Sequence, residues 1–124
     1  MSTSDVSLLN VSIGCNRVAD CIDWGSGGEL AYGANVFVAI FSLSESRTVA
    51  TLAGHTGRVN TVRWVSDNEI VSGASDGCVI LWRRAGPGAS FTEAQRFQLG
   101  KSVVVVGLCA YSYSSTTGNN SNVR

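Results

Sequence analysis

A chain of 124 residues has the length of one ordinary domain. Apolar residues make up 44% of it and charged residues 15%, a composition that is typical of packed globular segments and excludes a wholly disordered chain. The formal net charge is zero and the pI is about 6.5, so no overall charge draws the chain to nucleic acid or to an acidic membrane surface.

The first ten residues, MSTSDVSLLN, lack the charged start and apolar core of a secretory signal, and no apolar run reaches membrane-spanning length. The four cysteines have neither the paired spacing of a zinc site nor the density of a disulfide framework: Cys15, Cys21, Cys78 and Cys109. We therefore expect reduced, mostly buried thiols in a soluble intracellular protein, cytoplasmic and nuclear.

Fourteen glycines against one proline, with many valines, serines and threonines, favour strands joined by tight turns. In chain order, short apolar runs bounded by turn-forming residues predict strands within residues 17–24, 28–33, 35–43, 47–54, 57–65, 68–75, 77–84, 94–100 and 101–112. Only the segment TEAQRF, residues 92–97, offers even one plausible helical turn.

These runs repeat. Aligning residues 17–43 with residues 58–84 matches Trp24 to Trp64 and Gly33 to Gly73, and with one gap it matches Phe41 to Trp82, a period of 40 or 41 residues. Each unit has four predicted strands. The second unit also has a Gly-His start and a tryptophan near the end of its third strand, and in these features it resembles the WD-repeat family, which implies a β-propeller blade.

The expected fold is all-β: a partial WD-repeat β-propeller of about two four-stranded blades plus the start of a third. We predict a degenerate blade at 12–53, a well-formed blade at 54–99 and a remnant strand of a third blade at 100–111. Residues 1–11 are an N-terminal segment that can add an outer strand, and the polar residues 112–124 are expected to be a disordered tail. This pattern predicts a truncated array, with two apolar blade faces that neighbours should cover.

The only histidine, His55, is a candidate ligand, catalytic base or structural hydrogen-bonding group. No second histidine, G-x-S-x-G motif or cysteine at ligand spacing accompanies it, so we predict no catalytic residue, no metal ligand and no cofactor site. The WD-repeat resemblance implies instead a structural hydrogen-bond chain of His55, Ser72, Asp76 and Trp82. A buried indole N–H without an acceptor costs about 1–3 kcal/mol, which gives such a chain a physical purpose.

The first unit departs from this pattern. It has Gly14-Cys15 in place of Gly-His, and Tyr32, Asn35 and Phe41 in place of serine, aspartate and tryptophan. We expect apolar packing to hold it together.

Three other features have binding interpretations that we consider weaker. Trp24 and Trp64 could stack a ligand, but their apolar alternation favours packing between blades. A basic cluster is explained at least as well by a solvated blade edge: Arg83, Arg84, Arg96 and Lys101. The GSGG segment, residues 25–28, lacks a phosphate-loop lysine and predicts a hairpin turn.

A more specific resemblance joins the CNRV segment at residues 15–18, the LAYG and VAIF segments of the first unit, and the whole second unit. Over about residues 12–100 the chain resembles the start of the second-subunit family of the Elongator complex. The resemblance implies a non-catalytic scaffold that binds the large scaffold subunit and the acetyltransferase subunit, in an assembly that modifies wobble uridines of transfer RNA and is linked to transcription elongation. It implies no direct contact with nucleic acid or membrane.

Two alternatives stay open. One is a WD-repeat fragment of another assembly, such as a ubiquitin-ligase adaptor or a chromatin-binding subunit. The other is a small β-domain with enzymatic or ligand-binding activity, which the sequence disfavours because it lacks paired carboxylates, a nucleophile beside a base, and a metal cluster.

Overall fold

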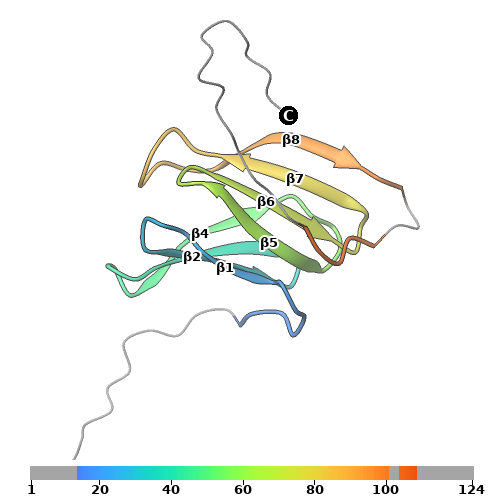
Figure 1. Cartoon of the computed structure of the whole chain (residues 1–124), viewed down its shortest axis with the longest axis horizontal. Coiled ribbons are helices and arrows are strands. Elements are labelled where there is room, and N and C mark those ends of the chain that lie inside the picture. The colour runs from blue at the N-terminus through green and yellow to red at the C-terminus, as the bar shows by residue number, and fades with distance from the viewer. Residues whose placement is uncertain (1–13, 101–103, 109–124) are drawn as a thin grey trace, which may run out of the picture.

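The computed structural model describes residues 14–100 and 104–108, and within them eight strands form two sheets (Figure 1). The first sheet contains β1 (Ile22–Trp24), β2 (Glu29–Ala34), β3 (Phe37–Ser42) and β4 (Arg47–Ala53). The second contains β5 (Val59–Ser66), β6 (Glu69–Ala74), β7 (Cys78–Arg83) and β8 (Thr92–Gln98). In both sheets the strands lie in chain order and pair antiparallel. The fold is therefore all-β, with two four-stranded antiparallel sheets, as predicted for two propeller blades.

Tight turns join the strands because the residues between them tolerate positive φ. The GSGG segment forms the predicted hairpin turn between β1 and β2, with Gly28 at φ 80°. Asn35 closes the β2–β3 turn at φ 55°, and Gly77 closes the β6–β7 turn at φ 75°. Asparagine and glycine reach this left-handed region at low cost, so these turns set the strand register.

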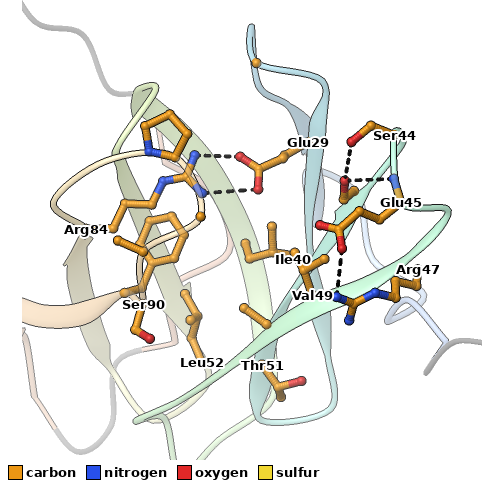
Figure 2. A pocket seen from close by; sticks show the side chains of 17 residues that line it. Glu29, Ile40, Ser44, Glu45, Arg47, Val49, Thr51, Leu52, Arg84 and Ser90 are labelled. Carbon is orange, nitrogen blue, oxygen red and sulfur yellow. Dashed lines mark hydrogen bonds and ion pairs between the residues drawn. The ribbon is translucent and has the colours of Figure 1, made fainter.

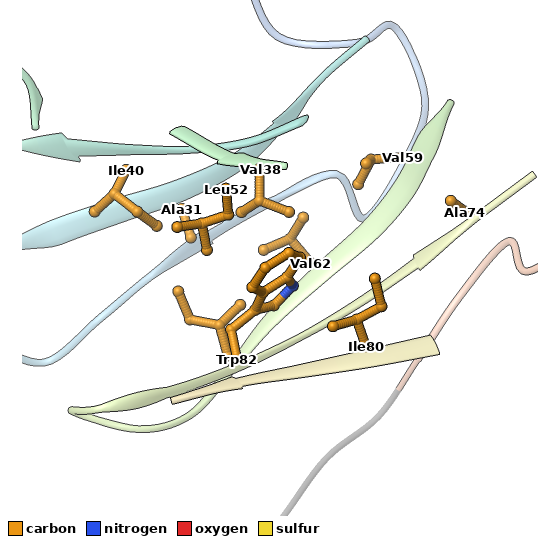
Figure 3. Packing of buried hydrophobic residues seen from close by; sticks show 10 residues of the cluster. Ala31, Val38, Ile40, Leu52, Val59, Val62, Ala74, Ile80 and Trp82 are labelled. Carbon is orange, nitrogen blue, oxygen red and sulfur yellow. The ribbon is translucent and has the colours of Figure 1, made fainter. Parts of the chain in front are cut away.

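The two sheets pack face to face, and the core lies between them (Figure 3). Alternation places every second residue of each strand on the shared face. Trp82 on β7 points from the second sheet toward the first, and only 3% of it is exposed. The first sheet contributes Ala31, Val38, Ile40 and Leu52; the second contributes Val59, Val62, Ile70, Ala74, Ile80 and Trp82.

The strands differ from the expectations at two places. The first inner strand was predicted within residues 17–24, but its paired part is only Ile22–Trp24, because residues 17–20 form a turn between the contacts of Asn16 and Cys21 with Gly33 of β2. The segment TEAQRF, which offered a helical turn, lies in β8, where its backbone pairs with β7. Pairing along a whole neighbouring strand outweighs a weak local helical preference.

Residues 104–108 form no strand, yet Val105 is seated against the second sheet. Its N–H donates to the carbonyl of Ala74 at 3.1 Å, and its side chain covers Gly73. These residues fall within the predicted remnant of a third blade. The predicted outer strand at 1–11 and the disordered tail at 112–124 lie outside the described residues. Among the described residues, no helix is long and apolar enough to cross a membrane.

Candidate functional site

The four residues of the predicted hydrogen-bond chain come together inside the second sheet. The Trp82 indole N–H donates to the Ser72 hydroxyl oxygen at 2.8 Å. The Ser72 hydroxyl lies 2.7 Å from His55 Nε2, and His55 Nδ1 lies 3.2 Å from a carboxylate oxygen of Asp76. Ser72 is fully buried and His55 is 6% exposed, so these groups rely on one another for hydrogen bonds.

The charge of His55 decides which group donates and which accepts in each of these hydrogen bonds. Burial lowers the pKa of His55 below its usual 6.5, although the Asp76 carboxylate acts in the opposite direction. The ring is therefore neutral at pH 7. Its Nδ1–H donates to Asp76, Nε2 accepts from the Ser72 hydroxyl, and the Ser72 oxygen accepts from Trp82, which leaves no donor opposing another donor.

Asp76 links this chain to the β6–β7 turn. Its carboxylate accepts the N–H of Cys78 at 2.9 Å and the N–H of Thr56 at 2.8 Å. Burial acts to raise the pKa of Asp76, but these backbone donors and His55 outweigh it and hold the pKa below its usual value. The carboxylate thus ties the Gly-His loop to the turn that precedes β7.

The glycine of the Gly-His pair has a steric role. A Cβ at Gly54 would lie 2.8 Å from the Trp82 ring, closer than real Cβ atoms approach a neighbour. A side chain there would push the indole away from Ser72. The spacing from Gly54 to Trp82 is therefore set by packing as well as by hydrogen bonding.

The first sheet packs through apolar contacts around the corresponding position. Tyr32 is 5% exposed and lies in a small cluster with Ala34 and Ala39, against which Leu30 and Phe41 pack. This is the arrangement that the substitution of serine by Tyr32 and of tryptophan by Phe41 suggested.

The two tryptophans at the ends of inner strands lie in different environments. Trp64 packs between the sheets: its indole N–H donates to the Asp23 carbonyl at 3.2 Å, and its backbone N–H donates to the Asp23 carboxylate at 2.8 Å. Trp24 was predicted to pack in the same way, and this was wrong, since 58% of it is exposed. The strand pattern is the same, but no described sheet lies beyond Trp24.

Arg84 was assigned to a solvated basic cluster, and this too was wrong. It is 7% exposed, and its guanidinium binds Glu29 of the first sheet at 2.5 Å and 3.1 Å. It also lies 4.8 Å from the Phe91 ring centroid and 5.6 Å from that of Trp64. Arg83 and Arg96 are exposed and pair with Glu69 and Glu93, while Lys101 lies outside the described residues. No local pattern indicates the contact of Arg84 (Figure 2), because Glu29 lies 55 positions away in the sequence.

Two asparagines form a further connection between units that the sequence analysis missed. The Asn16 amide donates to the carbonyl of Val59, the first residue of β5, at 2.9 Å. The Asn60 amide donates to the carbonyl of Val105, also at 2.9 Å. Each asparagine thus holds the chain that begins the following unit. The recurrence of Asn-x-Val in CNRV and VNTV was the available signal.

The described cysteines are free thiols with different exposure. Cys21 and Cys78 are buried as expected, Cys15 is exposed, and Cys109 lies outside the described residues. Burial, together with the nearby Cys15, raises the pKa of the Cys21 thiol to about 11, so it stays protonated at neutral pH. Within residues 14–100 and 104–108, no three His, Cys, Asp or Glu side chains group as metal ligands would.

The family described as WD domain, G-beta repeat matches residues 46–83, which run from the start of β4 to the end of β7. This segment holds all four members of the hydrogen-bond chain. Residues 46–83 are therefore similar to a WD repeat. The matched segment contains β4, the last strand of the first sheet, and β5 to β7 of the second sheet. One sequence repeat therefore spans parts of both sheets.

Several curated proteins are similar to the chain beyond this repeat. Elongator complex protein 2 of Drosophila melanogaster is 42% identical over 93 residues, 70% of this chain. The Dictyostelium discoideum protein of the same name is 36% identical over 102 residues, 72% of the chain, and the Arabidopsis thaliana protein is 29% identical over 118 residues, 86% of the chain. The chain spans only 11% to 14% of the length of these three relatives.

Proposed function

We propose that the chain is a non-catalytic protein-interaction module of an Elongator-type assembly. The observation that carries this proposal is the similarity to Elongator complex protein 2, which extends beyond the WD repeat to 70% of the chain. In this proposal residues 12–53 and 54–99 are consecutive blades of a propeller, and His55, Ser72, Asp76 and Trp82 stabilise the second one.

The chemistry of the buried polar groups supports a structural role for them. His55, Ser72 and Asp76 resemble the components of a nucleophile relay, but the Ser72 hydroxyl is fully buried and is engaged by both Trp82 and His55. A nucleophile must reach its substrate, and this oxygen has no exposed surface. The relay therefore fits the WD blade better than it fits a hydrolase.

The proposed partners are the large scaffold subunit and the acetyltransferase subunit of Elongator, in the cytoplasm and nucleus, with the chain supporting modification of transfer RNA wobble uridines and transcription elongation. The test is co-expression of the tagged chain with each subunit, followed by affinity purification. We expect both subunits to be recovered at a fixed ratio to the chain. An unrelated WD-repeat fragment of similar size, with the same tag, is the matched control.

Failure to recover either subunit, with circular dichroism showing a folded β-protein, would overturn the Elongator assignment. Recovery of ubiquitin-ligase or chromatin components from cells would support the alternative assembly. An enzymatic role would be supported by a His55→Ala variant that keeps its fold and loses one defined reaction.

A further inference from the structure

Two cysteines lie close together in the segment that leads into β1, residues 15–21, which we call the cysteine loop. The Cys15 side chain is exposed, and its sulfur lies 4.0 Å from the carbonyl oxygen of Cys21, whose own side chain is buried. Both residues are free thiols. We propose that they form a peroxide-sensitive pair, in which hydrogen peroxide oxidises Cys15 and Cys21 then closes a reversible disulfide across the loop.

Main-chain hydrogen bonds to one residue of β2 bring the ends of the cysteine loop together. The Asn16 N–H donates to the Gly33 carbonyl at 2.8 Å, and the Gly33 N–H donates to the Cys21 carbonyl, also at 2.8 Å. Asp20 lies in the turn between them at φ 63°, a conformation that aspartate adopts at lower cost than most residues. The fold therefore keeps the two cysteines close without a bond between them, as a disulfide requires.

The second sheet holds the same loop from the other side. The Asp20 carboxylate binds the Arg63 guanidinium at 2.8 Å, and the Asn16 side-chain amide donates to the Val59 carbonyl at 2.9 Å. These contacts fix the loop both near its start and near its end. The exposed thiol is thus held beside the buried one and does not depend on a chance encounter through a flexible chain.

The two thiols also act on each other. Burial is the largest cause of the raised pKa of the Cys21 thiol, about 11, and the Cys15 thiol raises it further by its charge and by a hydrogen bond. A hydrogen bond between two thiols requires neighbouring sulfur atoms. Cys21 is only 1% exposed and stays protonated, so Cys15 is the sulfur that an oxidant in solution meets first.

The proposed reaction has two steps. The Cys15 sulfur attacks one oxygen of hydrogen peroxide, the O–O bond breaks, and the thiol proton leaves with the other oxygen as water, which yields a sulfenic acid. The Cys21 sulfur then attacks the Cys15 sulfur, the S–O bond breaks, and the hydroxyl group leaves with the Cys21 proton as a second water. Two thiols are thereby oxidised by two electrons, and one peroxide molecule is reduced to two waters.

Oxidation acts at the contact between the two sheets. The disulfide closes the loop that carries Asn16, whose amide reaches the first residue of β5. It also removes the Cys21 S–H, which lies 3.4 Å from the Val59 carbonyl. A covalent link across the loop restrains the unfolded chain, and we expect this effect to outweigh the loss of one weak thiol donor.

The first experiment detects the bond itself and needs no partner protein. The purified, folded chain is treated with a small excess of hydrogen peroxide, blocked with N-ethylmaleimide and digested with trypsin. Cleavage after Arg17 separates the two cysteines, so the disulfide appears in mass spectra as a reducible link between residues 1–17 and residues 18–47. We expect this linked pair after oxidation and its disappearance after reduction.

Two results of this experiment would overturn the proposal. One is the absence of the link from the folded chain, or its formation only in chain that was unfolded in urea before oxidation. The other is a Cys15 sulfur linked to Cys78, to Cys109 or to a second copy of the chain.

Protein variants test the order of the two steps. Cys21→Ser and Cys21→Ala remove the second sulfur, while Cys78→Ser removes another buried thiol and is the matched control. Dimedone, a 1,3-diketone, reacts with sulfenic acids and so traps oxidised Cys15. We expect at least about tenfold more trapped Cys15 in the Cys21 variants than in wild type, and no increase in Cys78→Ser. Equal trapping in all of these proteins would contradict a disulfide formed by Cys21.

The urea midpoint measures the effect on the fold. Peroxide should raise the midpoint of the wild-type chain, because the link restrains its unfolded state, and should leave the midpoint of Cys15→Ser unchanged. An unchanged or lower midpoint of the disulfide-linked wild type would show that the loop is not arranged for this bond, and the proposal would fail.

Discussion

Ser72 lies at the centre of the buried hydrogen-bond chain, since its hydroxyl contacts both Trp82 and His55. Removing its hydroxyl leaves the buried indole N–H without an acceptor and the imidazole Nε2 without a donor. We therefore expect Ser72→Ala to lower the free energy of unfolding by about 1–3 kcal/mol, measured by urea denaturation. Ser90→Ala, at an exposed position, is the matched control and should change stability by less than about 0.5 kcal/mol. Equal stability of the two variants would show that the chain of hydrogen bonds adds nothing to the fold.

The buried His55 makes stability depend on pH. Burial lowers its pKa in the folded chain, so below the unfolded value of 6.5 the unfolded chain binds a proton that the folded chain does not. Stability should thus fall as pH drops from 7.5 to 5.5, by up to about 1.4 kcal/mol per pH unit for one proton. The pKa of Asp76 is also lowered, but from a usual value of 3.8. Its effect on the pH dependence of stability therefore appears only in a separate, more acidic range.

Because the chain contains a single histidine, its replacement identifies the group that titrates. A His55→Gln variant should be less stable at pH 7.5 but should show little further loss down to pH 5.5, as measured by urea denaturation at each pH. If wild type and variant lose stability in parallel over this range, a group other than His55 is responsible.

At the scale of elements, the first sheet meets β5 through a close contact at Gly33. A Cβ there would lie 2.9 Å from Val59 Cγ1 and closer still to Cys21 Sγ. We expect Gly33→Ala to lower the unfolding free energy by about 1–3 kcal/mol through overpacking. Gly27→Ala, where nothing lies within 4 Å, is the control and should cost little.

The double variant Cys21→Ala with Gly33→Ala tests the cause. Removing the thiol makes room for the new methyl group, so the double variant should lose less stability than the sum of the two single changes, by a thermal-denaturation cycle. Strict additivity of the two changes would place the strain of Gly33→Ala elsewhere.

The strands could be predicted because their signals are local. Alternation in VFVAIF and CVILW and the turn residues Asn35 and Gly77 specify two four-stranded units and their register. The hydrogen-bond chain could be expected only through the resemblance of the second unit to the WD-repeat family. The contact of Arg84 with Glu29 and the exposure of Trp24 were not, because an arginine's sequence neighbours do not reveal a distant carboxylate and alternation does not show whether a second sheet covers a face.

At the scale of the whole molecule, both ends of the two-sheet stack have exposed apolar side chains. Ile22 and Trp24 are 49% and 58% exposed on the first sheet, and Phe97 is 50% exposed on the second. Trp64, which matches Trp24 in the repeat, is half-buried and donates two hydrogen bonds to Asp23. Trp24 is therefore a large apolar side chain that no described sheet covers.

We expect this surface to make the isolated chain associate as its concentration rises, which sedimentation velocity would detect. Trp24→Ser should reduce association while leaving the urea midpoint close to wild type, whereas Trp64→Ser should lower the midpoint because its side chain packs between the sheets. A monomer at all concentrations, with a sharp cooperative melt when dilute, would contradict this expectation.

The asparagine contacts give the stack a direction. Asn16 is made before Val59 and Asn60 before Val105, and in each case the amide of the earlier residue donates to a carbonyl of the later segment. Each contact can form only after the later residue has left the ribosome, so we expect the units to dock in the order of translation.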